Sequence, residues 1–467
     1  MRIVLNKKQK SRKAEKQKNL TVLWSYALTV SLSSFLTFFV SYGQTSTREE
    51  PVSLTREVPA MKINEKTQKI MPVLDMLKIE QEDAEDNLNN VPPRFGFPHE
   101  TDFTLENSGE WIELPDGDKL WRLQIYCLNA TSINLLYDHF WLPEGAKFFI
   151  YNNDYREYLG AFTSKNNKGK KEDMRGFSTG LIFSDNITLE YYLPKGADDM
   201  GIISVSYVVH GYRSVCQNCI KDGYGFCCSS DLHSNAMCVS NFKNEKDAVV
   251  LMIANGNRYC TGSLVNTTAN ELHDRHFIIT AEECVKYVNS LFTGWMFYWH
   301  YESNTCTQPS NQPPLIYTQG ASVVAKSEKG NFALLELHKD PGLEWDVVPY
   351  YLGWDRSGTV PTGANWIIHH PHGDIKKIAD SSSPVSTFWM DITAWEVEGG
   401  FTDFRPPIGP EFGSEGAPLL NSNRKLIGQY WKQSTGYCGD DVVCIMPVLE
   451  NLVGRGIIIT HLIQLQD

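Results

Sequence analysis

The sequence predicts an all-β protein in which an N-terminal antiparallel β-sandwich precedes a second β-rich domain. Hydrophobic and polar residues alternate at 123–127 and 203–209, as they do in a strand that buries one face. Turn-forming residues at 142–145 and 195–196 separate such runs, which is the pattern of a sandwich. Short apolar strands continue after residue 214, so the second half of the chain is also predicted to be β-structure.

Length and charge set the class of protein. The chain has 467 residues, of which 42% are hydrophobic and 12% aromatic, enough for two or three domains with cores of their own. The formal net charge is −12. Because residues 1–43 are strongly basic, the remainder is more acidic than this figure. Such a chain repels polyanions, so nucleic acid is not expected as a partner.

Residues 1–43 have the order of an export signal. A lysine-rich start is followed by the uncharged stretch Leu20–Val40 and by small residues that end at Gly43. This order predicts a signal peptide that is cleaved after Gly43. The stretch is also long enough for an uncleaved membrane anchor, although its serines and threonines favour cleavage. In both cases the folded part is exported.

Residues 44–100 are predicted to form an extended linker or wrap. The segment is charged and repeatedly interrupted by proline, a composition that disfavours an independent core. Its one helical candidate is 71–84.

The β-sandwich domain is predicted at 101–213. Its alternation places Leu123, Ile125 and Cys127 on one face of their strand. In a later strand the alternation assigns one face to Ile203, Val205, Tyr207 and Val209. The tryptophans and tyrosines of this domain are expected in the core rather than on a sugar-binding surface, because alternation places them on the buried face.

Three stretches in the second half carry the functional signal: 277–284 (FIITAEEC), 330–337 (GNFALLEL) and 413–420 (GSEGAPLL). They resemble the T-A-x-H-C, D-F-A-L-L and G-x-S-G-S-P motifs of trypsin-type serine proteases. These motifs supply the general base, its orienting acid and the nucleophile. Strand patterns at 248–253 and 426–431 and a helical pattern at 448–453 complete the coarse assignment.

The resemblance extends from about residue 70 to 450 and is to the lysyl-endopeptidase-like branch of that family. It is carried by further stretches: NSGEWIELPDGDKLWR from 107, LPEGAKFFIYN from 142, CTGSLVN from 260, YWHYESNTC from 298, LGWDRS from 352 and IIHHPHGDIKKI from 367. It implies a trypsin-like double β-barrel at 214–467 with a short C-terminal helix. It also implies a carboxylate at the base of a lysine pocket, for which Asp440 and Asp441 are the candidates.

The catalytic positions implied by the resemblance hold Glu283, Asn331 and Glu415, and Gly413 with Glu415 forms the former oxyanion loop. Glutamate is a weak base, since the pKa of its side chain is ordinarily about 4.3. A neutral amide does not stabilise an imidazolium. A carboxylate nucleophile would form an unstable anhydride beside the oxyanion site. The sequence therefore predicts a pseudoprotease that is not an enzyme.

A relocated triad is disfavoured by the positions of the remaining groups. Ser414 lies one residue before the nucleophile position, so its side chain is directed elsewhere. His276 is seven residues from Glu283 along an extended segment. The histidines at 369, 370 and 372 are expected on a separate hairpin.

The resemblance also implies that Glu283 and Glu415 face each other in the cleft with Asn331 nearby. Two adjacent carboxylates repel, and protonation, outward rotation into water or a cation would relieve the repulsion. A calcium-like ion suits an all-oxygen set, so this pair is a speculative metal site. No other cofactor is expected.

Cysteine usage favours an oxidising compartment. Ten of the eleven cysteines lie between Cys216 and Cys444, and the resemblance implies a disulfide between Cys260 and Cys284. The other eight suffice for four more bridges. Cys216 begins a CxxC pattern, but zinc is disfavoured because no second pair at metal spacing accompanies it.

The sequence therefore predicts an exported binding or scaffold protein located in the periplasm, at the outer membrane or outside the cell. Its expected partner is a protein or extended peptide held in the former cleft, or the other subunits of a cell-envelope assembly. Membrane contact is expected only if the N-terminal segment stays uncleaved. The alternative is a residual hydrolase of serine-peptidase ancestry, in which other groups of the same cleft, such as two carboxylates and water, act on another bond.

Overall fold

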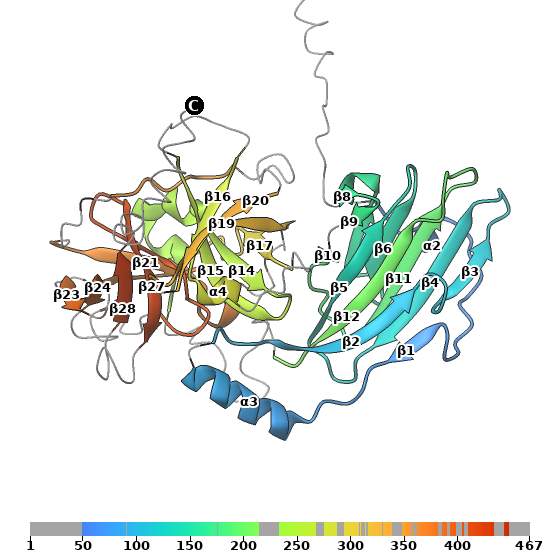
Figure 1. The fold of residues 1–467 in the computed structure, drawn as a ribbon, viewed down its shortest axis with the longest axis horizontal. Coiled ribbons are helices and arrows are strands. Elements are labelled where there is room, and N and C mark those ends of the chain that lie inside the picture. The colour runs from blue at the N-terminus through green and yellow to red at the C-terminus, as the bar shows by residue number, and fades with distance from the viewer. Residues whose placement is uncertain are drawn as a thin grey trace, which may run out of the picture. The chain divides into compact units, whose positions relative to one another are not determined.

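The computed structural model describes most of the chain between residues 49 and 447, and Figure 1 shows its elements. The description leaves out residues 1–48, 90, 175, 214–232, 268–274, 287–293, 308, 310–312, 314–315, 329, 339–347, 356, 358–361, 382–384, 390–392, 398–403, 406–409, 434–442 and 448–467. The predicted signal segment, the helix predicted at 448–453 and the pocket candidates Asp440 and Asp441 lie outside the described residues. No helix within the described ranges is long and apolar enough to cross a membrane.

The first half of the chain forms the predicted antiparallel β-sandwich. Its larger sheet has the order β1-β4-β11-β6-β7, with β3 paired to β4. These strands are β1 (Gln68–Ile70), β3 (Glu110–Glu113), β4 (Lys119–Tyr126), β6 (Lys147–Tyr151), β7 (Tyr158–Phe162) and β11 (Asn186–Leu193). The second sheet, β10-β5-β12-β2, contains β2 (Gly96–Thr104), β5 (Ser132–Trp141), β10 (Phe177–Ser178) and β12 (Ile202–Gly211). The small hairpin β8 (Gly169–Lys170) and β9 (Asp173–Met174) and the 3-10 turn η1 (Ser164–Asn166) lie between β7 and β10.

The sandwich core follows the predicted alternation in β4 and departs from it in β12. The residues predicted to share a face at 123–127 are fully buried in one apolar cluster. In β12 the register shifts between Val205 and Tyr207. Beyond this shift Val208 enters the sandwich core, whereas Tyr207 and Val209 contact residues of the second domain. The assignment of Tyr207 and Val209 to the core face is therefore wrong, because a bulge adds one residue and exchanges the faces.

The segment predicted as a linker contains short elements that contact the sandwich. They are α2 (Val52–Thr55), the edge strand β1, and α3 (Met76–Leu88), and β2 begins at Gly96. Strand β1 pairs in parallel with β4. The helix predicted at 71–84 exists but begins later, because Asp75 is its N-cap and accepts a hydrogen bond from the backbone N–H of Lys78 at 3.2 Å.

The second half of the chain forms two curled sheets of the trypsin-like double-barrel type. The first has the order β18-β17-β14-β15-β16-β20-β19 within the described residues. Its strands are β14 (Val249–Ala254), β15 (Arg258–Val265), β16 (Phe277–Thr280), β17 (Met296–Trp299), β18 (Ile316–Gln319), β19 (Ala321–Ser327) and β20 (Phe332–Leu337). Helix α4 (Glu283–Lys286) follows β16, and the 3-10 turns η2 (Ala236–Cys238), η3 (Ser240–Phe242) and η4 (Glu245–Ala248) precede β14.

The second curled sheet has the order β13-β22-β21-β26-β27-β28-β24-β23, with β25 paired to β22. Its strands are β13 (Ser234–Asn235), β21 (Asn365–His369), β22 (Lys377–Ser381), β23 (Val385–Trp389), β24 (Thr393–Val397), β25 (Phe404–Arg405), β26 (Pro418–Leu420), β27 (Leu426–Gln433) and β28 (Val443–Pro447). The 3-10 turn η5 (Pro371–Gly373) follows β21. The strands predicted at 248–253 and 426–431 are confirmed as β14 and β27.

An apolar cluster joins the sandwich to the first curled sheet. Its buried members include Phe95 and Val209 from the sandwich side and Tyr259 from β15. Two buried tyrosines add polar contacts: the hydroxyl of Tyr317 accepts the N–H of Gly180 at 3.2 Å, and that of Tyr298 accepts the N–H of Leu181 at 3.3 Å. The two halves therefore share one core.

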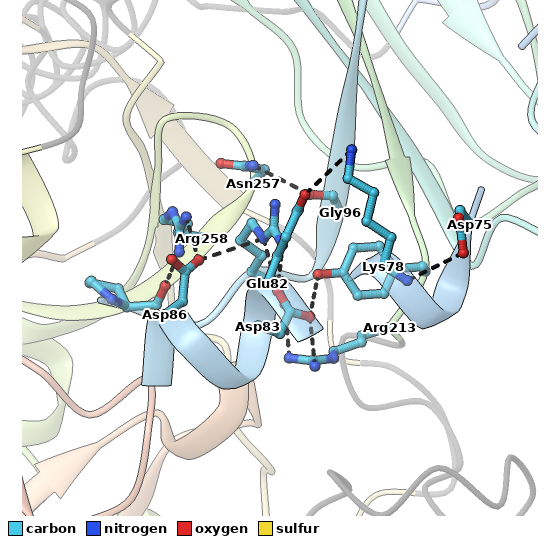
Figure 2. Close-up of polar contacts among 12 residues, drawn as sticks. Asp75, Lys78, Glu82, Asp83, Asp86, Gly96, Arg213, Asn257 and Arg258 are labelled. Carbon is cyan, nitrogen blue, oxygen red and sulfur yellow. Dashed lines mark hydrogen bonds and ion pairs between the residues drawn. The ribbon is translucent and has the colours of Figure 1, made fainter. Parts of the chain in front are cut away.

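Helix α3 provides an acidic face to which three arginines bind (Figure 2). The Asp83 carboxylate, 4% exposed, accepts from Arg94 Nε at 2.9 Å and from the Tyr212 hydroxyl at 2.8 Å, and it pairs with Arg213 at 2.8 Å. One helical turn later, Asp86 accepts from Arg258 of β15 at 2.8 Å. Residues from the linker, the sandwich end and the barrel therefore converge on this helix.

Replacement of Asp83 by Ala is expected to lower the free energy of unfolding by about 3–5 kcal/mol, because it leaves partly buried guanidinium groups without their carboxylate. The exposed Lys78–Glu82 pair on the same helix, at 3.9 Å, provides the control. Lys78→Ala should cost no more than about 0.5 kcal/mol. Urea unfolding of both variants measures the difference, and equal effects would contradict the assigned role of Asp83.

Candidate functional site

The three exchanged catalytic positions meet because the strands before them pair. Strands β16 and β20 are antiparallel, with Thr280 opposite Ala333, so the start of α4 lies beside the start of β20. This pairing brings Glu283 next to Asn331. The turn that carries Glu415 docks on β15, where the N–H of Thr261 donates to the Glu415 carbonyl at 2.9 Å. The predicted convergence of the three residues is thus present in the fold.

Glu283 and Asn331 form a hydrogen-bonded pair. The Asn331 Nδ2 donates to Glu283 Oε2 at 3.0 Å, and its Oδ1 accepts the backbone N–H of Glu282 at 3.0 Å. The second carboxylate oxygen of Glu283 accepts from Trp431 Nε1 at 3.0 Å. Since Asn331 is 2% exposed, its amide has a structural function: it holds the start of α4 and fixes the Glu283 side chain.

The carboxyl group of Glu415 folds back onto its own turn. Its Oε2 accepts the N–H of Gly413 at 2.7 Å. Glu415 is buried, with 6% of its surface exposed. The pKa of Glu415 is raised to about 8, mainly by burial and to a smaller extent by the nearby Glu283, while interactions with the backbone N–H groups of Glu415 and Gly413 act in the opposite direction. In the serine-protease motif the same two N–H positions bind the oxyanion. Here the Glu415 side chain accepts the first of them, the N–H of Gly413.

The turn requires glycine at both ends of the S-E pair. Gly413 has φ +92° and Gly416 has φ +85°, values that favour glycine. A Cβ at Gly416 would lie 2.4 Å from the carbonyl oxygen of Thr261 and 2.4 Å from Thr280 Oγ1. The backbone of the turn is therefore kept in its position against β15 although the side chain at 415 has changed.

Comparisons with known proteins show what this chain is similar to. Residues 226–442 match the family model described as lysyl endopeptidase, C-terminal domain. A lysyl endopeptidase of Pseudomonas aeruginosa is 26% identical over 355 residues, covering 71% of this chain and 72% of that protein. The chain is thus similar to lysyl endopeptidases over these residues. Among solved structures, the Rv3671c protease from M. tuberculosis has 13% identity, coverage of 45% and 80%, and a TM-score of 0.30. The serine endoprotease from Yersinia pestis has 11% identity, coverage of 44% and 60%, and a TM-score of 0.31.

The protease-like turn also contacts a histidine that was expected on a separate hairpin. His369 Nδ1 lies 2.8 Å from Ser414 Oγ, and His372 Nε2 lies 3.6 Å from a carboxylate oxygen of Glu411. These histidines do lie on a separate hairpin, formed by β21 and β22, and the pairing of β21 with β26, which directly follows the turn, brings His369 to Ser414. Side chains of adjacent residues point in opposite directions, so Ser414 faces this buried cluster while Glu415 faces Glu283.

The Ser414–His369 pair is enclosed by protein. Both residues are 0% exposed, and Ser414 Oγ also accepts the backbone N–H of Glu411 at 3.2 Å. Burial lowers the pKa of His369 well below its ordinary value, and the neighbouring His233 lowers it further. The neutral imidazole of His369 and the Ser414 hydroxyl are thus hydrogen-bonded to each other inside the protein, and this contact helps to hold the turn.

The acidic groups of the site are engaged by hydrogen-bond donors. Glu283 accepts from Asn331 and Trp431, and Glu415 accepts from Gly413. A calcium-like ion at Glu283 and Glu415 stays a prediction.

Elsewhere in the described residues, Asp247, His300 and Glu302 place one ligand atom each within 4.8 Å of the others. Two lysine ammonium groups already bind the acids of this cluster: Lys376 lies 3.1 Å from Glu302, and Lys246 binds both Glu302 and Asp247. This arrangement is a charge network in which lysines supply the positive charge.

The disulfide implied by the family resemblance, Cys260–Cys284, is confirmed, with a Cα–Cα distance of 6.1 Å. It links β15 directly to α4, next to Glu283. A second bridge joins Cys238 and Cys306, while Cys127 is a buried free thiol. These bridges support an exported protein. The remaining cysteines, including the CxxC at Cys216, lie outside the residues whose side chains are described.

Sequence reasoning did not identify three side chains that complete the site. They are Trp431, which binds Glu283; Gln429, whose Nε2 donates to the Asn331 carbonyl at 2.5 Å; and Lys326, which pairs with the buried Glu282 at 3.0 Å. In the A-E-E-C sequence at 281–284, the motif identified only the second glutamate, Glu283, as a site residue. Two consecutive acidic residues at a buried turn each require a donor from elsewhere in the fold.

Asn331→Asp is expected to lower the free energy of unfolding by roughly 1–3 kcal/mol, because the variant replaces a donor by an acceptor and leaves two carboxylates in contact. Glu283→Gln combined with Asn331→Asp restores a donor–acceptor pair and should recover part of the loss. Thermal and urea unfolding of the single and double variants provide the measurement. Strict additivity of the two changes would contradict the pairing.

The raised pKa of Glu415 predicts a specific dependence of stability on pH. Between the unfolded value of about 4.5 and the folded value of about 8, the native state holds a proton that the unfolded chain releases. The contribution of Glu415 is therefore complete below about pH 4.5 and is lost as pH rises toward 8, at roughly 1.4 kcal/mol per pH unit.

Glu415→Gln removes this titration, so the difference in unfolding free energy between the native chain and the variant should change steadily from pH 5 to 8. Other titrating groups cancel in that difference. Urea unfolding at four pH values measures it, and parallel curves would refute the assignment.

Proposed function

We propose that this protein is an exported pseudoprotease that binds a protein or an extended peptide without cleaving it. One observation carries the proposal: the Glu415 carboxyl accepts, at 2.7 Å, the N–H of Gly413, which is one of the two backbone donors that a protease uses to stabilise its oxyanion. A substrate carbonyl cannot use a donor that is already engaged. The general-base position holds Glu283, whose two oxygens both accept hydrogen bonds, so neither proton transfer nor charge stabilisation is provided.

The retained frame supports a binding role. The pairing of β16 with β20, the Cys260–Cys284 bridge and the glycines at 413 and 416 hold the former catalytic region in place. Such a rigid surface binds a ligand at a lower entropic cost than a flexible one. We place the protein in the cell envelope or outside the cell, as a scaffold or a subunit of an envelope assembly.

A residual hydrolase is the second candidate, and the Ser414–His369 hydrogen bond of 2.8 Å is the observation that favours it. For this pair to act, the turn would have to rotate Ser414 toward the substrate side. The burial of Ser414, which is 0% exposed, and its hydrogen bond from the Glu411 N–H oppose that rotation.

Restoring the three lost groups tests the proposal. The variant Glu283→His, Asn331→Asp, Glu415→Ser removes the carboxyl group from the Gly413 N–H and supplies a base, an orienting acid and a nucleophile. A serine-directed fluorophosphonate should label this variant at position 415 and should leave the native chain unlabelled. Mass spectrometry of the labelled peptide and hydrolysis of lysyl esters provide the readouts.

Two controls separate the candidates. Glu415→Ser alone should stay unlabelled because it lacks a base. Labelling of the native chain that disappears in Ser414→Ala would establish the hydrolase instead. If neither the native nor the folded triple variant is labelled, the inference that the catalytic frame is retained is wrong.

A further inference from the structure

The outer face of the larger sandwich sheet is covered by residues 49–61, here named the strap. Its helix α2 places Ser53 over Glu190 of β11. The Ser53 hydroxyl donates to Glu190 Oε2 and the Ser53 backbone N–H donates to Oε1 at 3.3 Å. The Tyr151 hydroxyl of β6 adds a third hydrogen bond at 3.0 Å. The strap thus supplies two of the hydrogen bonds that the Glu190 carboxylate accepts on this face of the sheet.

Glu190 is 0% exposed, so its hydrogen bonds decide whether the face is stable. A buried carboxylate requires donors, because its loss of hydration is otherwise uncompensated. The sheet supplies one donor, the Tyr151 hydroxyl of β6. The strap supplies two, the backbone N–H and the hydroxyl of Ser53. An incoming segment that presents an N–H and an O–H from the same small residue matches this acceptor.

The strap inserts one apolar side chain beside the polar contact. Val52 is 7% exposed and packs in a cluster with Leu120, Phe149 and Tyr151. A hydroxyl residue preceded by an aliphatic one therefore fits the face, with the aliphatic group in the apolar part and the hydroxyl on Glu190.

The ends of the strap are held by ion pairs near the surface. Glu49 pairs with Lys147 at 2.5 Å, and Arg56 pairs with Asp116 at 2.9 Å and with Asp118 at 3.1 Å. Exposed pairs of this kind each contribute about 0–1 kcal/mol. Beyond these pairs, the Pro59 carbonyl accepts from Arg122 Nη2 at 2.7 Å. The strap is therefore attached along its length by separate contacts of Ser53, Arg56 and Pro59, each of which can be removed by one substitution.

The groove is larger than its occupant. A pocket of about 310 Å³ lies on one side of the strap, between it and Lys147, Phe149 and Tyr192. Another of about 260 Å³ lies on the other side, lined by Arg122, Tyr155 and strap residues. Arg122 is 7% exposed, and its buried Nε has no hydrogen-bond partner within the described part of the chain. Space and an unused donor are both available to a longer or bulkier segment.

We propose that this groove is a peptide-binding site and that the strap is its intramolecular occupant. The expected ligand is a segment of a partner protein that forms a short helical turn like α2 and carries a small hydroxyl residue directly after an aliphatic residue, as Val52 and Ser53 do. Tethering gives the strap an effective concentration on the order of millimolar. The partner segment displaces it by also using the flanking pockets. This site lies on the sandwich and is independent of the former catalytic cleft.

A peptide with the sequence of residues 49–61, labelled with a fluorophore, tests the proposal in trans on the full chain. The variant Val52→Ala, Ser53→Ala loosens the strap and leaves the groove intact. Fluorescence anisotropy should show at least about tenfold tighter binding of the peptide to this variant than to the native chain. A matched peptide carrying Ser53→Ala should bind the variant at least about tenfold more weakly, since it loses a hydrogen bond to a charged group.

A second variant, Arg56→Glu, breaks the ion pairs at one end and leaves the groove and the centre of the strap unchanged. It should also bind the peptide more tightly than the native chain, and it keeps the test informative if the first variant does not fold. Failure of the peptide to bind either variant, in a preparation that retains its circular dichroism and cooperative melting, would overturn the proposal. Equal binding of the native and Ser53→Ala peptides would do the same.

Discussion

The turn at residues 413–416 constrains everything around the former catalytic cleft. Its two glycines adopt backbone angles that other residues reach only with strain, and Gly416 leaves no room for a Cβ against β15. As long as the glycines remain, the backbone directs its N–H groups to one place whatever residue stands at 415. The side chain of Glu415 accepts one of these groups, the N–H of Gly413, so the turn is stabilised by an internal contact.

The exchange at positions 283 and 331 keeps a hydrogen bond while reversing its polarity. In a protease the base at the first position donates a proton to a carboxylate at the second. Here Glu283 accepts and Asn331 donates. The amide oxygen of Asn331 still accepts the N–H groups at the start of α4, as a carboxylate would. The pair therefore holds the start of α4 in place through a hydrogen bond of the opposite polarity, and the proposed loss of the proton relay leaves the local structure intact.

The sequence identifies the fold and the exchanged residues because both depend on local pattern. Alternation, glycine spacing and motif register predicted the sandwich, the curled sheets and the positions of Glu283, Asn331 and Glu415. The bulge in β12 was not predictable in this way, because the extra residue near Tyr207 follows from the surface that the strand packs against. The contact of His369 with Ser414 and the donor from Trp431 depend on strand pairing between distant segments. The direction of the Glu415 side chain depends on a rotamer that residue type alone does not specify.

The contacts between the sandwich and the first curled sheet limit how a ligand can be bound. The sandwich and the first curled sheet are joined by a buried apolar cluster, by two tyrosine hydroxyls and by the arginines around Asp83. Independent motion of the two parts would break these contacts at once, so a ligand cannot be captured by closing one part onto the other at low energetic cost. Recognition instead depends on surfaces that are already formed, such as strand edges and grooves. In the sandwich, the carboxylate of Glu190 is buried under the strap, which supplies two of its hydrogen-bond donors. The proposed exchange of one peptide segment for another depends on this arrangement, because a segment with matching donors replaces the strap without rearrangement of the core.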